Sequence, residues 1–429
     1  MRIDKLIFPS QNKIVILHFN LPEQIDVLIL VKNRWLIYLL LVVCAMPLFA
    51  QDESYYEPFT LPQPPEGLIS PEILPDNRVV FRLYAPDAIS VSVNSDCFGR
   101  DIDTTPFGSS KGTVQLEKDS LGVWSYKTKY PVYPNCYTYD YLVDYIHNVI
   151  DPANPEDAWN QGSHFSVFAV GGDDIADLFI QSDVPHGEVQ VERYFSDCMG
   201  HERRMAIYLP PNYDSVSHTY PVLYLLHGIS GDEMAWLSLG RVAQICDNMI
   251  AKKIIEPMVV VMPNCNVMIS NEEDGATTLT ENILNIPKQL SGFLEECFYE
   301  LTDYVDSHYS ISPLQSDRSI AGLSSGGHQA ANLAIIMPNY FGSIGLFSAT
   351  LWKKNVPTVS ATADSPYYYI YVGKNDWVSW SLSQKTTRRL EKRGYHVDVI
   401  ETHGGHAWKW WRNYLIRYIL NFDAHQKQK

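Results

Sequence analysis

The sequence predicts an α/β fold with a mostly parallel sheet, preceded by a small all-β domain. Two patterns carry this prediction. Between residues 76 and 170, short runs alternate apolar and polar residues, whereas after Gly171 longer apolar runs alternate with helical segments. A period of two is typical of half-buried strands, and near-continuous apolar strands separated by helices are typical of a parallel sheet covered on both faces.

The overall composition fits a globular protein of two domains. The 429 residues are 46% hydrophobic and carry a formal net charge of −16. This acidic balance argues against a broad phosphate-binding surface, so nucleic acid is not expected as a partner.

The seven cysteines form no C-x-x-C pair and no cysteine–histidine pattern, so no metal site is expected. Cys97 and Cys136 fall in one β-rich segment and are the first pair to test for a disulfide, although spacing does not fix the connectivity.

The first 50 residues contain an export signal that does not begin at the first residue. Lys32 and Arg34 precede the twelve-residue apolar run WLIYLLLVVCAM, and PLFA then leads into the polar QDESYYEP. This order is that of a secretory signal peptide, and the run is shorter than the roughly 20 residues that span a bilayer. We therefore expect translation to begin near Val31, so that residues 1–50 are a non-native extension plus a signal peptide. The bacterial protein is expected in the periplasm, at the cell surface or outside the cell, without stable membrane insertion after signal removal; a membrane anchor is the alternative.

Residues 51–75 and 76–170 predict a linker followed by a β-sandwich. The first segment is rich in proline and reads as a linker or surface arm. The second contains four runs with strand periodicity, bounded by turn residues: RVVFRLYAP, ISVSVNS, GVWSYKTK and TYDYLVDY. Through FRLYAPDA, GVWSY, YTYDYLVD and DPANP, this segment resembles the early-set immunoglobulin-like domain related to carbohydrate-binding module family 48. The resemblance implies a module beside a catalytic domain, which either binds glycan through exposed aromatic rings or has a structural role only.

Residues 171–429 predict the larger α/β domain. Seven apolar runs read as its strands: MAIYLP, VLYLLHG, MVVVMPN, RSIAGLS, SIGLFSA, YYYIYVG and HVDVIETHGG. Amphipathic segments between them predict helices at 284–309, 326–337 and 380–394.

The stretch AGLSSGGHQ lies where an apolar strand ends and an alanine-rich helix begins. Gly322 to Gly326 form a G-x-S-x-G motif, which in this context predicts a sharp turn that presents the hydroxyl of Ser324. The two glycines lack the Cβ atoms that would crowd such a turn, and the turn often forces a positive φ on the serine. Ser324 is therefore the predicted nucleophile.

Two further candidates follow later strands. Asp376 comes after YYYIYVGKN, and His406 comes after HVDVIETHGG. Because functional groups collect beyond the carboxyl ends of the strands of an open α/β sheet, and because the order Ser, Asp, His is that of α/β-hydrolases, we predict a triad. His406 is expected to act as the base on Ser324, and Asp376 to orient the imidazole ring. Three competing candidates are less well placed. His403 lies within or at the edge of a predicted strand, His328 lies in the helix after the turn of Ser324, and Asp364 precedes its strand and so lies at the opposite end of the sheet.

The oxyanion donors are predicted to be backbone N–H groups. Ser325 begins the helix after the nucleophile, and Ile229, with Gly228 next, lies in the earlier loop HGISGDEMAW. His227 is expected to fix that loop through a hydrogen bond rather than to act as a base. Four residues beside the motif loops are candidates to line the substrate pocket, with packing as the alternative: Trp236, Asn264, Trp377 and Trp408.

The segment from Val184 to Phe422 resembles the esterase D group of α/β-hydrolases, and specifically carbohydrate esterase family one. The shared stretches are VPHGEV, YFS, RRMAIYLPPNYD, YPVLYLLHGISGDEMAW, VVVMPN, AGLSSGG, VGKND and GGHAWKWWRNYL. The resemblance implies hydrolysis of feruloyl or acetyl esters on plant polysaccharides without a metal or other cofactor, and it assigns the same three catalytic residues. Ser325 stands where the family usually has methionine, and Ile229 where it has glycine; a backbone donor survives both changes, and Ile229 is expected to narrow the acyl site.

The predicted function is that of an exported serine esterase acting on plant polysaccharide or oligosaccharide esters, such as those of xylan, through an acyl-enzyme. Siderophore trilactone hydrolysis is an alternative, because trilactone esterases also join an amino-terminal β domain to this fold. A basic pocket would favour it, and the loops show no cluster of arginines. The alternative of another class is a glycan-binding protein with an inactive esterase fold.

Overall fold

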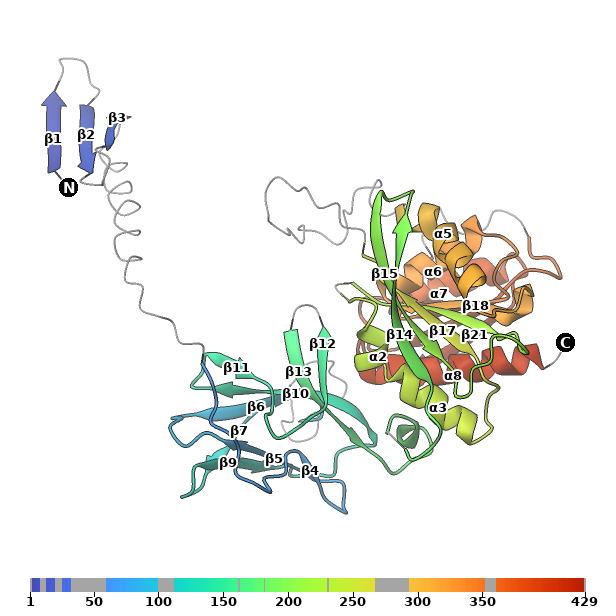
Figure 1. Cartoon of the computed structure of the whole chain (residues 1–429), viewed down its shortest axis with the longest axis horizontal. Coiled ribbons are helices and arrows are strands. Elements are labelled where there is room, and N and C mark those ends of the chain that lie inside the picture. Colours follow the sequence, from blue (N-terminus) through green and yellow to red (C-terminus); the bar gives the residue numbers. More distant parts are fainter. Residues whose placement is uncertain are drawn as a thin grey trace. The chain divides into compact units, whose positions relative to one another are not determined.

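The structure is a computed structural model that describes residues 2–7, 13–19, 25–31, 59–98, 112–160, 163–180, 182–229, 231–266, 293–351 and 360–427. It divides into two compact units, Met1–Thr60 and Leu61–Lys429 (Figure 1). The first unit contains an antiparallel sheet of β1 (Arg2–Ile7), β2 (Lys13–Phe19) and β3 (Ile25–Val31). The predicted signal peptide, from residue 32 to 50, lies outside the described residues. Nowhere in the described ranges is a helix both long and apolar enough to cross a membrane.

The second unit begins with a β domain of two antiparallel sheets. The smaller sheet has the order β4 (Glu72–Ile73), β5 (Val79–Tyr84), β9 (Val123–Lys127), β8 (Glu117–Lys118). The larger has the order β12 (Asp157–Asn160), β13 (Ser163–Val170), β10 (Asn135–Val143), β6 (Val91–Ser95), β7 (Gly112–Gln115), and β11 (His147–Val149) also pairs with β10. The four runs predicted as strands are β5, β6, β9 and β10.

Aromatic side chains from both sheets form the core of the β domain. The ring of Phe81 packs edge-on against Phe98, Tyr139 and Phe168 at centroid distances of 5.6, 5.2 and 5.6 Å. The end of the predicted linker joins this domain, because the Ser70 hydroxyl lies 3.0 Å from the hydroxyl of Tyr141 and β4 pairs with β5. The β domain therefore begins before residue 76.

An eight-stranded sheet forms the centre of the α/β domain. Its order is β14 (Glu188–Ser196), β15 (His201–Leu209), β17 (Val259–Pro263), β16 (Val222–Leu226), β18 (Arg318–Leu323), β19 (Ser343–Phe347), β20 (Tyr367–Gly373), β21 (Val397–Thr402). β15 is antiparallel to β14 and β17, and the strands from β17 to β21 are parallel. All seven predicted strands are present, so the prediction of an α/β domain with a mostly parallel sheet is confirmed.

Helices cover both faces of this sheet. The helices are α2 (Ala235–Ser238), α3 (Val242–Ala251), α5 (Phe293–His308), α6 (Ser325–Ile336), α7 (Trp380–Glu391) and α8 (Trp408–Gln426), with 3-10 turns η2 (Ala176–Leu178) and η3 (Gln315–Asp317). The buried residues of α3 and α8 join the apolar cluster on one face, and those of α5, α6 and α7 join the cluster on the other. The predicted helices at 326–337 and 380–394 are α6 and α7. Of the predicted helix at 284–309, residues 284–292 lie outside the described residues.

The β domain shares an apolar cluster with the α/β domain. Cys136, Ala158 and Val167 are buried together with Trp236 and with residues of α3 and α8. Arg412 of α8, only 1% exposed, donates to the carbonyl oxygens of Cys136 in β10 and of Leu239 in the connection between α2 and α3. The two domains thus form one compact unit, consistent with the division of the chain at Leu61.

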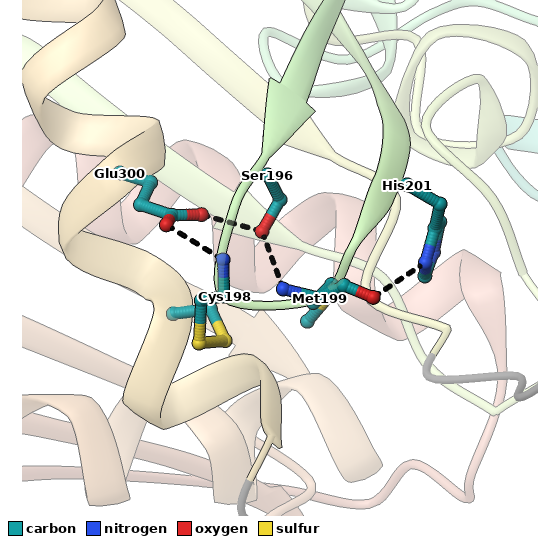
Figure 2. Close-up of a disulfide and its surroundings, with 6 residues drawn as sticks. Ser196, Cys198, Met199, His201 and Glu300 are labelled. Carbon is teal, nitrogen blue, oxygen red and sulfur yellow. Dashed lines mark hydrogen bonds between the residues drawn. A yellow bond between two sulfur atoms is a disulfide. The ribbon is translucent and has the colours of Figure 1, made fainter.

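A disulfide joins Cys198 to Cys297, with a Cα–Cα distance of 5.6 Å (Figure 2). Cys198 lies in the turn between β14 and β15, and the carboxylate of Glu300 on α5 accepts hydrogen bonds from its backbone N–H, at 2.9 Å, and from the Ser196 hydroxyl. The bridge and these bonds hold the β14–β15 turn against α5.

The suggested Cys97–Cys136 disulfide is wrong, because neither residue is disulfide-bonded in the structure. Cys136 is buried in the cluster shared with the α/β domain, whereas Cys97 packs against the core of the β domain. The two side chains therefore belong to different apolar clusters. Burial raises the pKa of the Cys136 thiol.

Candidate active site

Ser324 stands on a strained turn between β18 and α6. Its φ of 51° is in the left-handed region, and its backbone N–H donates to the carbonyl oxygen of Phe347 at 2.9 Å. A Cβ atom at Gly322 would lie 2.4 Å from the carbonyl carbon of Gly326, and one at Gly326 would lie 2.2 Å from the carbonyl oxygen of His227. Only glycine fits at either position, so the sequence around the serine is dictated by the close approach of backbone to backbone.

The side chains of Ser324, His406 and Asp376 form one hydrogen-bonded series. His406 Nδ1 lies 3.0 Å from Asp376 Oδ2, and His406 Nε2 lies 3.0 Å from Ser324 Oγ. An ionised carboxylate only accepts, so Nδ1 carries the proton that donates to Asp376. Nε2 is then the acceptor for the Ser324 hydroxyl, which is the arrangement that a base for this hydroxyl requires.

Asp376 is fully buried yet well supplied with donors. Its Oδ1 accepts from the backbone N–H groups of Val378 and Ser379, at 3.1 and 3.0 Å, and its Oδ2 accepts from the Ser379 hydroxyl at 2.6 Å as well as from His406. Burial by itself raises the pKa of Asp376. The hydrogen bonds from His406 and Ser379 and the charge of His406 lower it by more than burial raises it, so the pKa of Asp376 lies below the ordinary value for an aspartate. The carboxylate is therefore charged at neutral pH.

The loop after β16 lies directly beside the nucleophile. A Cβ atom at Gly228 would be 3.5 Å from the Cβ of Ser324 and 2.4 Å from Leu323 Cδ1. The carbonyl oxygen of Gly228 accepts from His227 Nδ1–H at 2.7 Å and from the N–H of Gly231 at 3.1 Å. Because C=O and N–H point in opposite directions within the plane of a trans peptide, these bonds direct the N–H of Ile229 away from His227 Nδ1 and the N–H of Gly231.

His227 has the structural role that the sequence predicts. It is 2% exposed, and its Nε2 accepts the backbone N–H of Cys265 at 2.8 Å while its Nδ1–H donates to Gly228. Burial lowers the pKa of His227 below 6.5, which favours the neutral ring that both bonds need. Ser325, the other predicted oxyanion residue, is the first residue of α6, where backbone N–H groups have no acceptor within the helix.

The four predicted lining residues are placed very differently. Trp236 is 1% exposed and donates to the carbonyl oxygen of Leu226, so it is a packing residue and the expectation that it lines a pocket is not met. Trp408 is partly buried, and its ring packs edge-on against Trp236 at 5.1 Å. Asn264 donates to Glu233 at 2.8 Å and braces the loop. Trp377, next to Asp376, is 87% exposed and is the one of the four whose ring is open to solvent.

The competing catalytic candidates make other contacts. The carbonyl of the exposed His403 accepts from the Asn375 side chain, and His328 Nδ1 is engaged by the carbonyl of Thr350. The backbone of Asp364 accepts from Gln315, which precedes β18 and so marks the amino end of the strands. The position of Asp364 agrees with the sequence argument that set it aside.

Two supporting residues were missed by the sequence reasoning. Ser379 immediately precedes α7 and holds Asp376 through both its hydroxyl and its N–H, and a serine three residues after an aspartate at the start of a helix is a signal that could have indicated it. Glu233, 2% exposed, pairs with Arg204 at 2.6 Å and accepts from Asn264. This carboxylate connects the loop after β16 with β15 and with the loop after β17.

A serine on a strand-to-helix turn, with a histidine and an aspartate from the ends of later strands of a mostly parallel sheet, defines the α/β-hydrolase class. Within this class the chain belongs to the Esterase family, whose model, described as "Putative esterase", matches residues 196–422. The protein is therefore a hydrolase of carboxylic esters.

Curated relatives that share sequence with the chain include two that differ in length. One, an endo-1,4-beta-xylanase/feruloyl esterase of Xylanibacter ruminicola, is 28% identical over 344 residues, which cover 78% of this chain and 43% of the relative. The chain thus spans less than half the length of that protein. The other, the uncharacterized protein YjcH of Bacillus subtilis, is 23% identical over 240 residues, which cover 53% of this chain and 94% of the relative.

Solved structures share the fold at lower identity. The ferulic acid esterase of Anaeromyces mucronatus in complex with ferulic acid matches with a TM-score of 0.50 and 20% identity, covering 58% of this chain and 94% of that one. The enterobactin esterase of Shigella flexneri matches with a TM-score of 0.56 and 15% identity, covering 80% of this chain and 92% of that one. The second match extends beyond the residues of the family model and so includes part of the β domain.

Proposed function

We propose that the protein is an exported serine esterase that removes feruloyl or acetyl groups from plant cell-wall polysaccharide or oligosaccharide, with Ser324, His406 and Asp376 as its catalytic residues. The observation that carries the proposal is the pair of 3.0 Å hydrogen bonds that His406 makes to Ser324 and Asp376.

The first half of the reaction acylates Ser324. His406 Nε2 accepts the hydroxyl proton as Oγ attacks the ester carbonyl, and the resulting imidazolium is stabilised by the carboxylate of Asp376. The negative oxygen of the tetrahedral intermediate is bound by the backbone N–H groups of Ser325 and Ile229, with Gly228 as the next candidate donor. His406 then gives its proton to the departing sugar oxygen as the carbon–oxygen bond breaks, which leaves an acyl-enzyme.

The second half releases the acid. Water attacks the acyl carbonyl while His406 Nε2 takes one proton from it, and the same donors bind the oxyanion. The proton then returns to Ser324 Oγ as that bond breaks, and the feruloyl or acetyl group leaves as the carboxylic acid. Trp377, exposed beside Asp376, is our candidate for contact with the substrate at the mouth of the site.

The substrate class rests on the named relatives. The protein of Xylanibacter ruminicola is an endo-1,4-beta-xylanase/feruloyl esterase, and the structure from Anaeromyces mucronatus is a ferulic acid esterase. The test compares hydrolysis of methyl ferulate with release of acetate from acetylated xylan by the native chain and by Ser324→Ala. Hydrolysis of neither compound by the folded native chain would contradict the proposal.

A siderophore trilactone is the second candidate substrate. It is favoured by the match to the enterobactin esterase, which extends over 80% of this chain. Enterobactin added to the same assay distinguishes the two, because a trilactone esterase would cleave enterobactin with a much higher kcat/KM than methyl ferulate.

Two further proposals concern the parts outside the esterase domain. The β domain is proposed to be an early-set immunoglobulin-like module related to carbohydrate-binding module family 48, supported by its two antiparallel sheets around one aromatic core. Export through a signal between residues 32 and 50 is proposed from the sequence; amino-terminal sequencing of the protein recovered outside the cytoplasm tests it, and a mature end far upstream of Gln51 would contradict it.

A further inference from the structure

The turn that carries His406 is fixed by contacts with two other segments. It connects β21 to α8, and the Gly404 carbonyl oxygen accepts from the N–H of Asn375, the residue before Asp376, at 3.0 Å. A Cβ atom at Gly404 would lie 2.4 Å from the ring of Trp410, so this indole packs directly on the backbone of the turn. The turn is therefore held by the loop of the catalytic aspartate and by the first turn of α8.

The next tryptophan of α8 contacts the imidazole ring itself. Trp411 is 7% exposed, and its ring packs edge-on against that of His406, with a centroid distance of 4.9 Å and an interplanar angle of 89°. This contact involves no atom that reacts, so the reaction does not remove it. The hydrogen bond between Ser324 and His406 is different, because it depends on the hydroxyl proton that Ser324 loses when it is acylated.

A series of edge-on aromatic contacts holds Trp411 in place. Its ring packs against Trp408 at a centroid distance of 5.4 Å, and Trp408 packs against Trp236 at 5.1 Å. The indole N–H of Trp236 donates to the carbonyl oxygen of Leu226, the last residue of β16, at 3.0 Å. The three indoles belong to one apolar cluster. The series therefore connects the ring of the base to the strand that precedes the loop of Gly228 and Ile229.

The ring of Trp411, rather than its N–H group, makes the contact that matters. Its buried Nε1 has no hydrogen-bond acceptor among the described residues, whereas Nε1 of Trp236 has one. A phenylalanine at position 411 would keep an aromatic ring beside His406 and would remove only this N–H. The structure thus offers a conservative substitution that preserves the contact.

The contact gains importance once Ser324 has been acylated. Before the reaction, His406 is held by two hydrogen bonds of 3.0 Å, to Asp376 and to Ser324. In the acyl-enzyme, Ser324 Oγ is an ester oxygen that only accepts, and Nε2 of the neutral imidazole also only accepts, so no hydrogen bond joins them. The ring is then held by the bond to Asp376 and by the contact with Trp411.

We propose that Trp411 is a positioning residue that keeps the His406 ring in place while the acyl-enzyme is hydrolysed, an inference that rests on the proposed function. His406 acts as a base twice, and only in the first half of the reaction does the Ser324 hydroxyl bind its Nε2. In the second half, Nε2 must lie within hydrogen-bonding distance of the attacking water. Loss of the aromatic contact therefore slows deacylation more than acylation.

The test measures pre-steady-state and steady-state hydrolysis of 4-nitrophenyl acetate, because a burst of nitrophenol reports acylation and the slower phase reports deacylation. We expect Trp411→Leu to lower kcat about tenfold and kcat/KM by less than about threefold, so that KM falls together with kcat and a burst appears. Trp411→Phe should restore most of the native kcat. Trp408→Leu, one ring further from His406, should lower kcat by only about two- to threefold.

Trp124→Leu is the matched control for loss of a buried tryptophan. Trp124 is also 7% exposed, but it lies in β9 and belongs to the apolar cluster of the β domain. This variant should lose stability as Trp411→Leu does, with kcat and kcat/KM unchanged. If Trp411→Leu does not fold, Trp411→Met takes its place, because the flexible methionine side chain fills more of the space and carries no ring.

The outcomes separate this proposal from the proposed function. A folded Trp411→Leu or Trp411→Met with native kcat overturns the role of Trp411, and so does a variant whose kcat/KM falls as far as its kcat. A Trp411→Phe variant that is no better than Trp411→Leu also overturns it. A native chain that neither hydrolyses an ester nor reacts with a serine-directed fluorophosphonate contradicts the proposed function instead. A selective loss of deacylation that phenylalanine restores, and that Trp124→Leu does not show, supports the proposal.

Discussion

Replacement of His227 tests how the oxyanion loop is oriented. The ring makes two bonds, one from Nδ1–H to the Gly228 carbonyl at 2.7 Å and one to Nε2 from the Cys265 N–H at 2.8 Å. The first bond fixes the peptide that carries the N–H of Ile229. Loss of the second bond leaves the buried N–H of Cys265 without its acceptor. We expect His227→Ala to lower kcat through the first effect and the free energy of unfolding through the second.

The expected magnitudes follow from the bonding. Loss of a complete oxyanion donor lowers kcat by about 10² to 10³. Because the N–H of Gly231 also donates to the Gly228 carbonyl, at 3.1 Å, the peptide is only partly released. We therefore expect kcat to fall about 10- to 100-fold, or about 1.4 to 2.7 kcal/mol, with little change in KM. The unpaired Cys265 N–H should lower the free energy of unfolding by about 1 to 3 kcal/mol.

A matched pair of variants separates the two bonds. The amide of His227→Asn places a donor near the position of Nδ1, and the longer His227→Gln places an acceptor near that of Nε2. The assay is steady-state hydrolysis of a 4-nitrophenyl ester together with urea unfolding. His227→Asn should keep more of the native kcat, and His227→Gln more of the native stability. A folded His227→Ala with kcat within about twofold of the native value would refute the reasoning, because the loss of one oxyanion donor is worth far more than that.

Three other outcomes follow from the structure. Ser324→Ala should lower kcat by about 10⁴-fold or more without changing the melting temperature greatly, and near-native turnover would exclude it as the nucleophile. Cys198→Ser should lower the free energy of unfolding by about 2 to 4 kcal/mol because it opens the bridge to Cys297, and a reductant that destabilises the native chain but not the variant is the control. Burial lowers the pKa of His227 and His328, so the unfolded chain binds more protons below pH 6.5 and the free energy of unfolding should fall there by at most about 1.4 kcal/mol per pH unit for each ring. Stability that rises as the pH falls from 6.5 to 5 would contradict these assignments.

The strands and the candidate triad could be predicted because each has a local signature. Buried parallel strands are continuous apolar runs, and the end of such a run marks the edge of the sheet where Ser324, Asp376 and His406 meet. The two glycines of the motif are likewise explained by close contacts. A Cβ atom at Gly322 would clash with the backbone of Gly326, four residues later, and one at Gly326 would clash with the backbone of His227 in the adjoining loop. Local pattern and tertiary structure agree at these positions.

Features that depend on distant contacts could not be read in this way. Cys198 and Cys297 are 99 residues apart, and their pairing depends on how α5 packs against the turn between β14 and β15, whereas Cys97 and Cys136 belong to different apolar clusters. Trp236 follows the loop of Gly228 and Ile229, yet its ring is buried and its indole N–H donates to the carbonyl oxygen of Leu226. Proximity along the chain does not determine the direction of a side chain, so the lining of the pocket was the weakest part of the sequence interpretation.

The buried guanidinium of Arg412 has a consequence for protein engineering. It bonds to backbone of both domains from a helix that begins two residues after His406, within a cluster that neither domain completes alone. Deleting the amino-terminal domain would remove the acceptors that Asn135 and Cys136 offer to Arg412 and would expose the apolar side chains of α8 that belong to the shared cluster. A fusion protein that uses this α/β domain should therefore also include the β domain that precedes it in the chain.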